Sequence, residues 1–217
     1  MLFGISAKKQ SGKDLFLKIW NALILTKKGD ELTDSEIDEL QKDILDRGAE
    51  YFGVGTYEKH YFARPLKEVC ASIFGCSPED FESEIFKETE LPEEWAGNLL
   101  GIKTYREALQ FIGTELFRSQ FHNDVWVIAS TSRYKDGMNW FFTDVRFPNE
   151  KDAIERLGGK VIRIDTDNVS NDEHMSEKAL DDAEFDIRIK NEFNFAKYVR
   201  DIYSIMINVG IFNSSKK

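Results

Sequence analysis

A short run of small and charged residues near the N-terminus has the spacing of a phosphate-binding loop. Residues 7–14 read AKKQSGKD and include Gln10, Ser11, Gly12 and Lys13, the last part of such a loop. Backbone N–H groups in a loop of this kind point at one anion, together with the N-terminus of the helix that follows. Lys13 would reach the β- and γ-phosphates of a bound nucleotide.

Two positions of this loop differ from the usual pattern. Ala7 stands at the first glycine, and Asp14 stands where serine or threonine normally contacts Mg²⁺. Alanine lacks the conformational freedom of glycine, so the loop forms only if Ala7 has an ordinary backbone conformation. A carboxylate is also a hard oxygen ligand, so Asp14 keeps the capacity to bind a metal, directly or through water. We therefore predict a phosphate site here rather than a plain turn.

A second group of candidate residues follows the most apolar stretch of the chain, WFFTDV at residues 140–145. Asp144 stands near the end of this expected strand, and a carboxylate there is suited to hold a metal ion. Arg146 can reach a phosphoryl oxygen from the same edge. A plainer interpretation is a strand end followed by a helix that Asn149 caps with the help of Glu150. We favour the functional interpretation for Asp144 and Arg146.

Further cations gather on two expected helices in the first half of the chain. One helix carries a polar row at intervals of four residues: Arg106, Gln110, Thr114 and Arg118. Arginine forks suit phosphate, and a glutamine amide can pair with the edge of a base. The other helix begins at Ala63-Arg64-Pro65-Leu66-Lys67, which places Arg64 and Lys67 at a helix N-terminus. A solvated charged face is the competing interpretation for both helices.

Strands and helices alternate along the chain, which indicates a mostly parallel sheet covered on both faces. We expect strands at 2–6, 140–145, 160–165 and 186–189. We expect helices from about 14 to 24, 34 to 45, 65 to 74, 104 to 121, 149 to 157 and 195 to 208. Ligands in such folds bind beyond the carboxyl ends of the strands, so the loop and the segment after the 140–145 strand should lie at one edge.

Composition narrows the classes of partner. The 29 basic and 39 acidic residues give a net charge of −10, which argues against a nucleic-acid-binding surface. The chain has no stretch of roughly 18 apolar residues, so no membrane partner is expected. The two cysteines, Cys70 and Cys76, are not at metal-ligand spacing and indicate reduced thiols in a cytoplasmic protein. A homodimer is considered, although the sequence has no evident apolar seam from which to predict one.

Six blocks of this sequence, in order, resemble the deoxynucleoside monophosphate kinases of bacteriophages and, more distantly, animal phosphomevalonate kinase. They are SGKD at 11–14, FARPLKEV at 62–69, REALQFIGTELFR at 106–118, DVRFPNE at 144–150, HMSE at 174–177 and IRIKN at 187–191. The resemblance covers nearly the whole chain except residues 27–60, which have the character of a lineage-specific insertion. Ala7 departs from the usual first glycine, and Arg64 stands where a small or acidic residue is common.

The resemblance implies a fold, a reaction and a setting. The fold is one three-layer P-loop NTPase domain over residues 1–217, with a helical acceptor-binding region at 62–121 and a lid at 166–185. The reaction is phosphoryl transfer from ATP, with Mg²⁺, to a deoxynucleoside 5′-monophosphate. The setting is dNTP synthesis during phage infection, in the host cytoplasm. Closure of the lid and of residues 77–103 would exclude water.

The resemblance also implies roles for residues. The donor phosphates would contact Ala7, Gln10, Ser11, Gly12, Lys13 and Asp14. The catalytic residues would be Lys13, Asp144 and Arg146, and Asp14 and Asp144 would hold Mg²⁺. The acceptor would be bound by Arg64, Lys67, Arg106, Gln110 and Arg118. Two alternatives stay open: a kinase of another small phosphorylated metabolite, and a nucleotide-binding protein without turnover. The preferred base and sugar also stay open.

Overall fold

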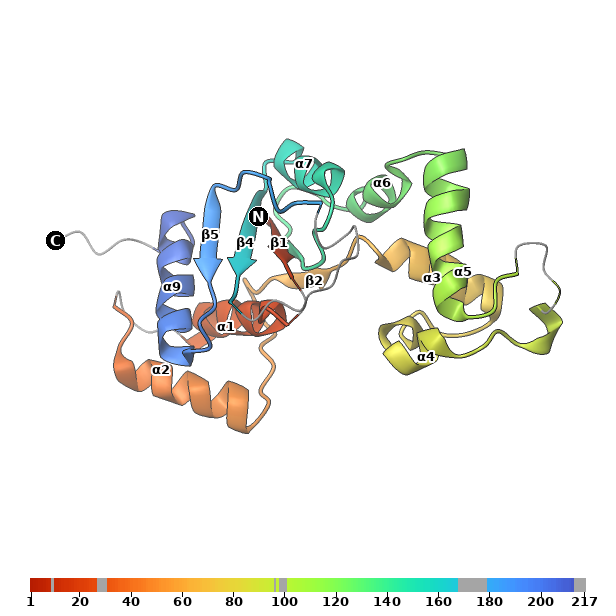
Figure 1. Ribbon diagram of the computed structural model, residues 1–217. Helices are drawn as coiled ribbons and strands as arrows, with labels where there is room; N and C mark the ends of the chain where they lie inside the picture. The colour runs from red at the N-terminus through yellow and green to blue at the C-terminus, as the bar shows by residue number, and fades with distance from the viewer. Residues whose placement is uncertain (9, 27–30, 96, 98–100, 168–178, 213–217) are drawn as a thin grey trace. The chain divides into compact units, whose positions relative to one another are not determined.

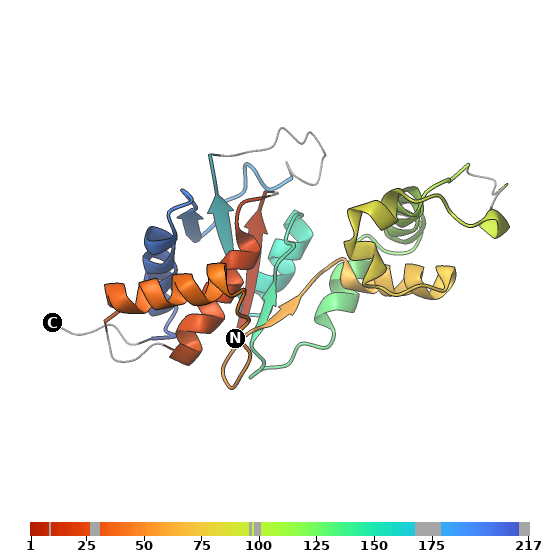
Figure 2. The same ribbon diagram turned by 90° about the horizontal axis from the view of Figure 1, so that it is seen from below.

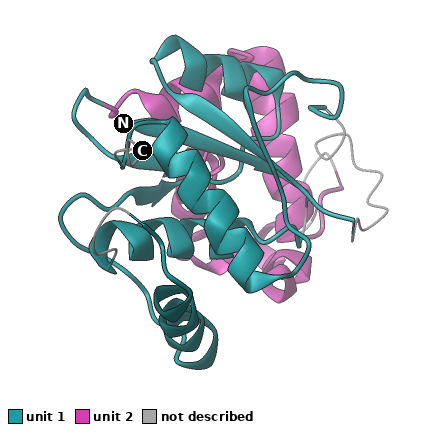
Figure 3. Ribbon diagram, turned by 90° about the vertical axis from the view of Figure 1, so that its left-hand side faces the viewer, with its two compact units in different colours: residues 1–60, 135–217 teal, residues 61–134 magenta. Residues whose placement is uncertain are grey.

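The fold of the chain is given by a computed structural model, which describes residues 1–8, 10–26, 31–95, 97, 101–167 and 179–212. The chain forms two compact units, residues 1–60 with 135–217 (unit 1) and residues 61–134 (unit 2), coloured separately in Figure 3. Unit 1 contains the sheet. In its described residues, unit 2 is built from helices and turns, with an isolated antiparallel bridge between Glu90 and Thr104.

The sheet of unit 1 has five parallel strands in the order β2-β3-β1-β4-β5 (Figure 1). The strands are β1 Leu2–Ala7, β2 Glu58–His60, β3 Trp140–Phe142, β4 Lys160–Asp165 and β5 Ile187–Lys190. The parallel α/β fold expected from the sequence is confirmed. β2 was not expected, because its sequence EKH is short and polar. It lies at the edge of the sheet, where a strand needs no apolar face on both sides.

The helices of unit 1 cover both faces of the sheet. They are α1 Lys13–Thr26, α2 Asp34–Gln41 with a π-helical continuation Lys42–Asp46, α7 Pro148–Arg156 and α9 Phe195–Asn208. Figure 2 shows α1, α2 and α9 on one side of the strands and α7 on the other. This is the three-layer arrangement that the sequence predicted. No helix in the described chain is long and apolar enough to cross a membrane.

The core of unit 1 is aromatic on the face that α1 and α9 cover. Phe3 of β1 stacks on Phe141 of β3 at 5.1 Å, and Trp20 of α1 meets Phe3 edge-on at 5.2 Å between ring centroids. On the opposite face, a Cβ at Gly4 would lie 2.5 Å from Ile154 Cδ1 of α7. Gly4 therefore permits the close packing of α7 on β1. The candidate site lies at the carboxyl end of this strand.

The chain beyond β3 differs from the expected strand at 140–145. Regular pairing ends at Phe142, so Asp144 and Val145 lie in the connection to α7. The backbone still bonds to both neighbouring strands, because Thr143 N donates to His60 O and Val145 N donates to Ile5 O. The backbone on either side of Asp144 is therefore tied to the sheet, although Asp144 is outside the strand.

The helices of unit 2 are α3 Arg64–Phe74, α4 Glu84–Glu88, α5 Tyr105–Gln110 and α6 Val125–Thr131. The expected helix at 104–121 is α-helical only to Gln110 and continues as a π-helix, Phe111–Arg118. Ser119 N donates to Thr114 O, the i−5 bond of that geometry. Because π-helical turns are wider than α-helical turns, the angle around the axis between Arg106 and Arg118 differs from that in a regular α-helix.

Candidate active site

The loop between β1 and α1 has the backbone geometry that Ala7 requires. Ala7 is the last residue of β1 and pairs with Ile164 of β4, so its backbone is extended. Left-handed conformations occur instead at Gln10, with φ of 64°, and at Gly12, with φ of 86°. The first glycine is therefore not needed at position 7 for this loop to form.

Asn191, at the end of β5, holds the loop. Its side-chain Nδ2 donates to Ser11 O at 3.0 Å, and its Oδ1 accepts from Phe193 N at 3.0 Å. Its backbone N donates to Asp165 O at 2.8 Å. A Cβ at Gly12 would lie 2.4 Å from Asn191 Nδ2, so glycine is required there for space as well as for φ. Asn191 was not among the sequence candidates, although it ends the IRIKN block.

Lys13 is the first residue of α1 and stands among four other charged groups. Burial lowers the pKa of Lys13, and the positive charges of Arg146 and Lys59 lower it further. The carboxylates of Asp14 and Asp144 act in the opposite direction and raise it. The Lys13 ammonium makes no hydrogen bond or ion pair within the described chain. The structure thus brings together the predicted residues Lys13, Asp14, Asp144 and Arg146.

Lys59 is a member of this group that the sequence did not indicate. Its Nζ lies 2.5 Å from Asp14 Oδ1. The lysine belongs to β2, the short polar edge strand, and no periodicity marks such a strand in the sequence. Asp14 is exposed on the first turn of α1, so this ion pair neutralises a predicted metal ligand in the present structure.

Glu150 organises the segment that carries Arg146. Its buried carboxylate accepts hydrogen bonds from Arg146 N at 2.8 Å and from Phe147 N at 3.1 Å. The next helix begins at Pro148, so the expected N-cap role of Asn149 is wrong. Glu150 at the third helical position bonds the preceding backbone instead, as an acidic residue in a capping box does. The side chain of Arg146 is exposed at the sheet edge.

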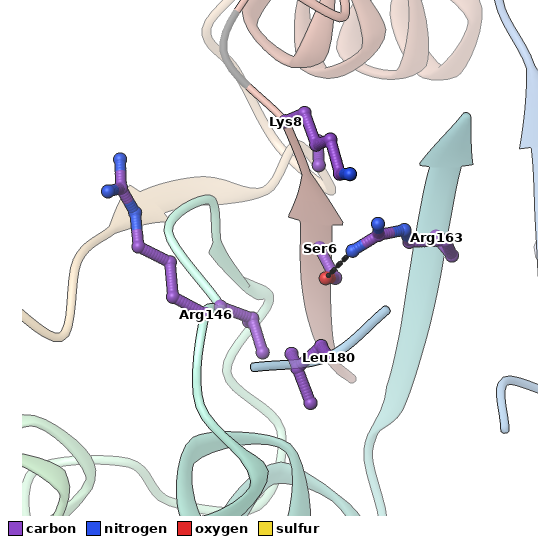
Figure 4. Close-up of a pocket in the computed structure, with 7 residues that line it drawn as sticks. Ser6, Lys8, Arg146, Arg163 and Leu180 are labelled. Carbon is purple, nitrogen blue, oxygen red and sulfur yellow. Dashed lines mark hydrogen bonds between the residues drawn. The ribbon is translucent and has the colours of Figure 1, made fainter. Parts of the chain in front are cut away.

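A small pocket opens beyond the carboxyl end of β1 (Figure 4). It is lined by Ser6, Ala7, Lys8, Val145, Arg146, Arg163 and Leu180. Arg163 of β4 is 7% exposed and donates from Nη1 to Ser6 Oγ at 2.9 Å. Its Nη2 and the Nζ of Lys8 both bond Asp181, each at 2.9 Å. An arginine among the apolar residues of the strand KVIRID could have indicated that Arg163 has a role at this edge, but Arg163 was not among the residues predicted from the sequence.

Two buried hydroxyls near this edge lack partners in the described chain: Ser11 Oγ in the loop and Thr143 Oγ1 next to Asp144. Within the described residues, no three His, Cys, Asp or Glu side chains form a cluster that could enclose a metal ion. Mg²⁺ bound with a nucleotide needs only one or two carboxylates besides the phosphates and water. Asp14 and Asp144, both acting on Lys13, fit that requirement.

The residues predicted to bind the acceptor all lie in unit 2. Arg64 and Lys67 are on the first turns of α3, and Arg106 is on α5. A Cβ at Gly113 would lie 2.8 Å from Leu66 Cδ2, so glycine allows the π-helical stretch to pass close to α3. Gln110 is exposed.

Three of these cations are paired with carboxylates. The pairs are Arg64 with Glu68 and Glu79, Lys67 with Glu82, and Arg106 with Glu84 and Glu88. Four of the five carboxylates belong to residues 79–88, which contain α4 and the preceding turn Asp80–Glu82. The pairs with residues 79–88 could not be predicted from the sequence, because the partners are 15 to 22 residues apart and lie on short elements without periodicity.

Comparison with known proteins supports the resemblance noted in the sequence. The family model for deoxynucleotide monophosphate kinases matches residues 57–202, a range that begins after the phosphate loop. A protein of Acanthamoeba polyphaga mimivirus, whose curated name proposes a deoxynucleotide monophosphate kinase, is 31% identical over 176 residues. The alignment covers 74% of this chain and 88% of the viral protein. Neither alternative function is favoured by these matches. The chain belongs to the deoxynucleotide monophosphate kinase family.

Proposed function

We propose that this nucleotide kinase transfers the terminal phosphoryl group of ATP to a deoxynucleoside 5′-monophosphate and releases ADP and the diphosphate. Membership of the family supports the reaction class. The donor site is placed at the loop from Ala7 to Asp14. The observation that supports this choice is the position of Lys13, which lies near two carboxylates and two further cations. The setting we propose is the cytoplasm, that of the host if a phage encodes the chain.

The donor phosphates would lie over the loop. Backbone N–H groups of the loop and of the first turn of α1 would bind the phosphate oxygens. Lys13 would place its ammonium on the transferred group, and a bound polyphosphate would restore the charge that burial disfavours. Arg146 would neutralise negative charge as the group moves.

Asp14 and Asp144 would hold Mg²⁺ with the donor. When bound, the ion supplies positive charge to the β- and γ-phosphoryl oxygens. Asp14 would have to exchange its ion pair with Lys59 for the metal, which frees the lysine for the anionic nucleotide. The carboxylate of Asp144 would keep its place because the backbone on either side of it bonds to β1 and β2.

The acceptor monophosphate would be bound by cations of unit 2, namely Arg64, Lys67, Arg106 and Arg118, with Gln110 at the base. The acceptor oxygen is already part of an anionic phosphate, so the reaction needs no strong base. Positioning and electrostatic stabilisation make up most of such a catalyst. This agrees with the choice of cations rather than a nucleophile as the candidate catalytic groups.

The test is ADP release from ATP and Mg²⁺ with dAMP, dCMP, dGMP and dTMP and their ribose counterparts. Lys13→Ala serves as the blank, and a parallel series with EDTA removes the metal. We expect acceptor-dependent release by the wild type that is lost in the variant and in EDTA. Absence of release with every acceptor, from folded protein that binds ATP, would refute the proposal.

A further inference from the structure

An acidic segment of unit 2 lies against the cations that are proposed to bind the acceptor phosphate. Residues 77–95 contain eight acidic residues and one basic residue, Lys87. In a pocket kept open for a phosphate, cations would face solvent or neutral groups. Here the segment turns four carboxylates toward the very cations proposed to bind the acceptor.

The contact at Arg106 has the form of anion recognition. Glu84 Oε2 lies 2.5 Å from Nη2 of Arg106, and Glu88 Oε1 accepts from Nε. Together the two carboxylates occupy donors on the guanidinium fork that a phosphate would take with two of its oxygens. Arg106 is thus already bound to two carboxylates of its own chain.

α4 is also joined to its neighbours by apolar contacts that do not involve the charged groups. Phe86 of α4 stacks on Tyr105 of α5 with ring centroids 4.4 Å apart and meets Phe81 at 5.4 Å. Ser83 caps the helix by accepting from Phe86 N. The carboxylates are therefore presented to Arg106 by a packed element, and they can leave the guanidinium by side-chain rotation alone.

We propose that α4 is an internal competitor for the acceptor: Glu84 and Glu88 occupy the guanidinium of Arg106 until a monophosphate displaces them. The inference rests on the proposed function and names the regulation of that same site. A phosphate dianion carries more charge on one group than a carboxylate and has three acceptor oxygens. It therefore displaces the two glutamates from the guanidinium of Arg106. Weaker anions, which offer one charge and no base, are excluded. Acceptor affinity is lower than the cations alone would give.

The experiment is calorimetric binding of the four deoxynucleoside monophosphates, without ATP, to the wild type and to a Glu84→Gln/Glu88→Gln double variant. Glutamine keeps the size of the side chain and removes the charge. Glu94→Gln is the matched control, since it removes an exposed charge from the same acidic segment and its carboxylate has no ion pair within the described chain. Thermal unfolding checks that each protein is folded.

We expect the double variant to bind its best monophosphate at least fivefold more tightly than wild type, with ATP affinity unchanged and Glu94→Gln like wild type. The affinity for the monophosphate should also fall more steeply with salt in the double variant. In the wild type, salt weakens both monophosphate binding and the competing ion pairs of Arg106, and these two effects partly cancel. The double variant lacks the competing ion pairs. Unchanged or weaker binding would overturn the proposal, since the glutamates would then be inert or would orient Arg106.

Binding and turnover separate the two hypotheses. If the double variant binds more tightly but no acceptor supports ADP release, the proposed function fails and the competition stands. If wild type turns over but the double variant gains no affinity, the competition fails alone. If no monophosphate binds either protein, the competition and the acceptor role of Arg106 fail together.

Discussion

The sheet edge of unit 1 and the cation cluster of unit 2 present their charges in opposite ways. At the sheet edge, Lys13 has no ion-pair partner within the described chain and sits at the end of a loop held by Asn191. In unit 2, Arg106 and Lys67 are each bound to a carboxylate from the segment 79–88. Lys13 is thus without a carboxylate bonded to it in that part of the chain, although Asp14 beside it is paired with Lys59, whereas both cations of unit 2 already bind carboxylates.

The difference follows from what holds each set of residues. The loop and the Asp144 segment extend from buried parallel strands, so their positions are determined by the core. The cations of unit 2 lie on α3 and α5, and most of their partners come from residues 79–88, which contain a short turn and the five-residue helix α4. Exposed ion pairs can exchange partners at small cost, whereas a partly buried lysine without a partner is unfavourable unless a ligand compensates.

The largest effect is expected at Lys13. Lys13→Ala should lower kcat by about 10²–10³, the range seen when one donor to a developing charge is removed. Burial lowers the pKa of Lys13, so the fold disfavours the charged form of this side chain, and its removal should not reduce the melting temperature. Steady-state kinetics and thermal unfolding test both parts. Loss of activity together with loss of stability would mean that the lysine supports the fold instead.

The next largest effect is a loss of stability, and a glycine-to-alanine change in each unit allows the two units to be compared. Gly4→Ala places a Cβ 2.5 Å from Ile154 Cδ1 and 2.9 Å from Val145 Cγ2 in the core of unit 1. It should lower the free energy of unfolding by about 1–3 kcal/mol, measured by urea titration. Gly113→Ala is the counterpart in unit 2, where a single flexible leucine end must move and the helix gains alanine. An equal or larger loss from Gly113→Ala would contradict this contrast.

Asn191→Ala should separate loop geometry from chemistry. Without the bond from Nδ2 to Ser11 O, the loop loses its anchor, and we expect the KM for ATP to rise about tenfold, or ~1.4 kcal/mol. The acceptor KM should stay near the wild-type value. Asn194→Ala is the control, because it removes the N-cap of α9 and some stability but leaves the loop alone. A similar rise in that control would assign the effect to stability.

The sequence predicted the parts of the molecule that depend on burial. β1, β4 and α9 lie within a residue of their expected bounds, because each has a clear apolar pattern and a clear stop. The charged group around Lys13 could also be predicted, since the carboxyl ends of parallel strands share one edge. The individual roles assigned to these residues, and to those that would bind the acceptor, remain predictions.

Features of the fold and site that could not be predicted from the sequence depend mostly on contacts between residues far apart in the chain. Lys59 comes from a three-residue edge strand, and Asn191 acts on a loop 180 residues away. The π-helical stretch at 111–118 has the same apolar pattern as an α-helix, so periodicity does not reveal it. Part of the predicted lid at 166–185, including His174, lies outside the described residues. The predicted insertion at 27–60 includes α2 and ends in β2.

The smallest effect on stability is expected from removing the ion pairs of unit 2. Its size indicates whether these pairs serve to stabilise the fold. The Lys87 ammonium and then the Arg106 guanidinium lower the pKa of Glu84 to about 2. Because this pKa is depressed, the contribution of Glu84 to stability is complete above its unfolded pKa of about 4.3 and is lost as pH falls toward 2. The Glu84 side chain is 63% exposed, so solvent screens the pair and Glu84→Gln should cost less than about 1 kcal/mol at pH 7.

Urea titrations of wild type and Glu84→Gln at pH 7 and pH 2.5 measure this difference. We expect a gap that is small at pH 7 and smaller at pH 2.5. A cost of several kcal/mol at pH 7 would make the pairs part of the scaffold, and the contrast between the units would disappear. A small cost means that α4 holds its carboxylates against Arg106 for a reason other than stability, which competition with the acceptor supplies.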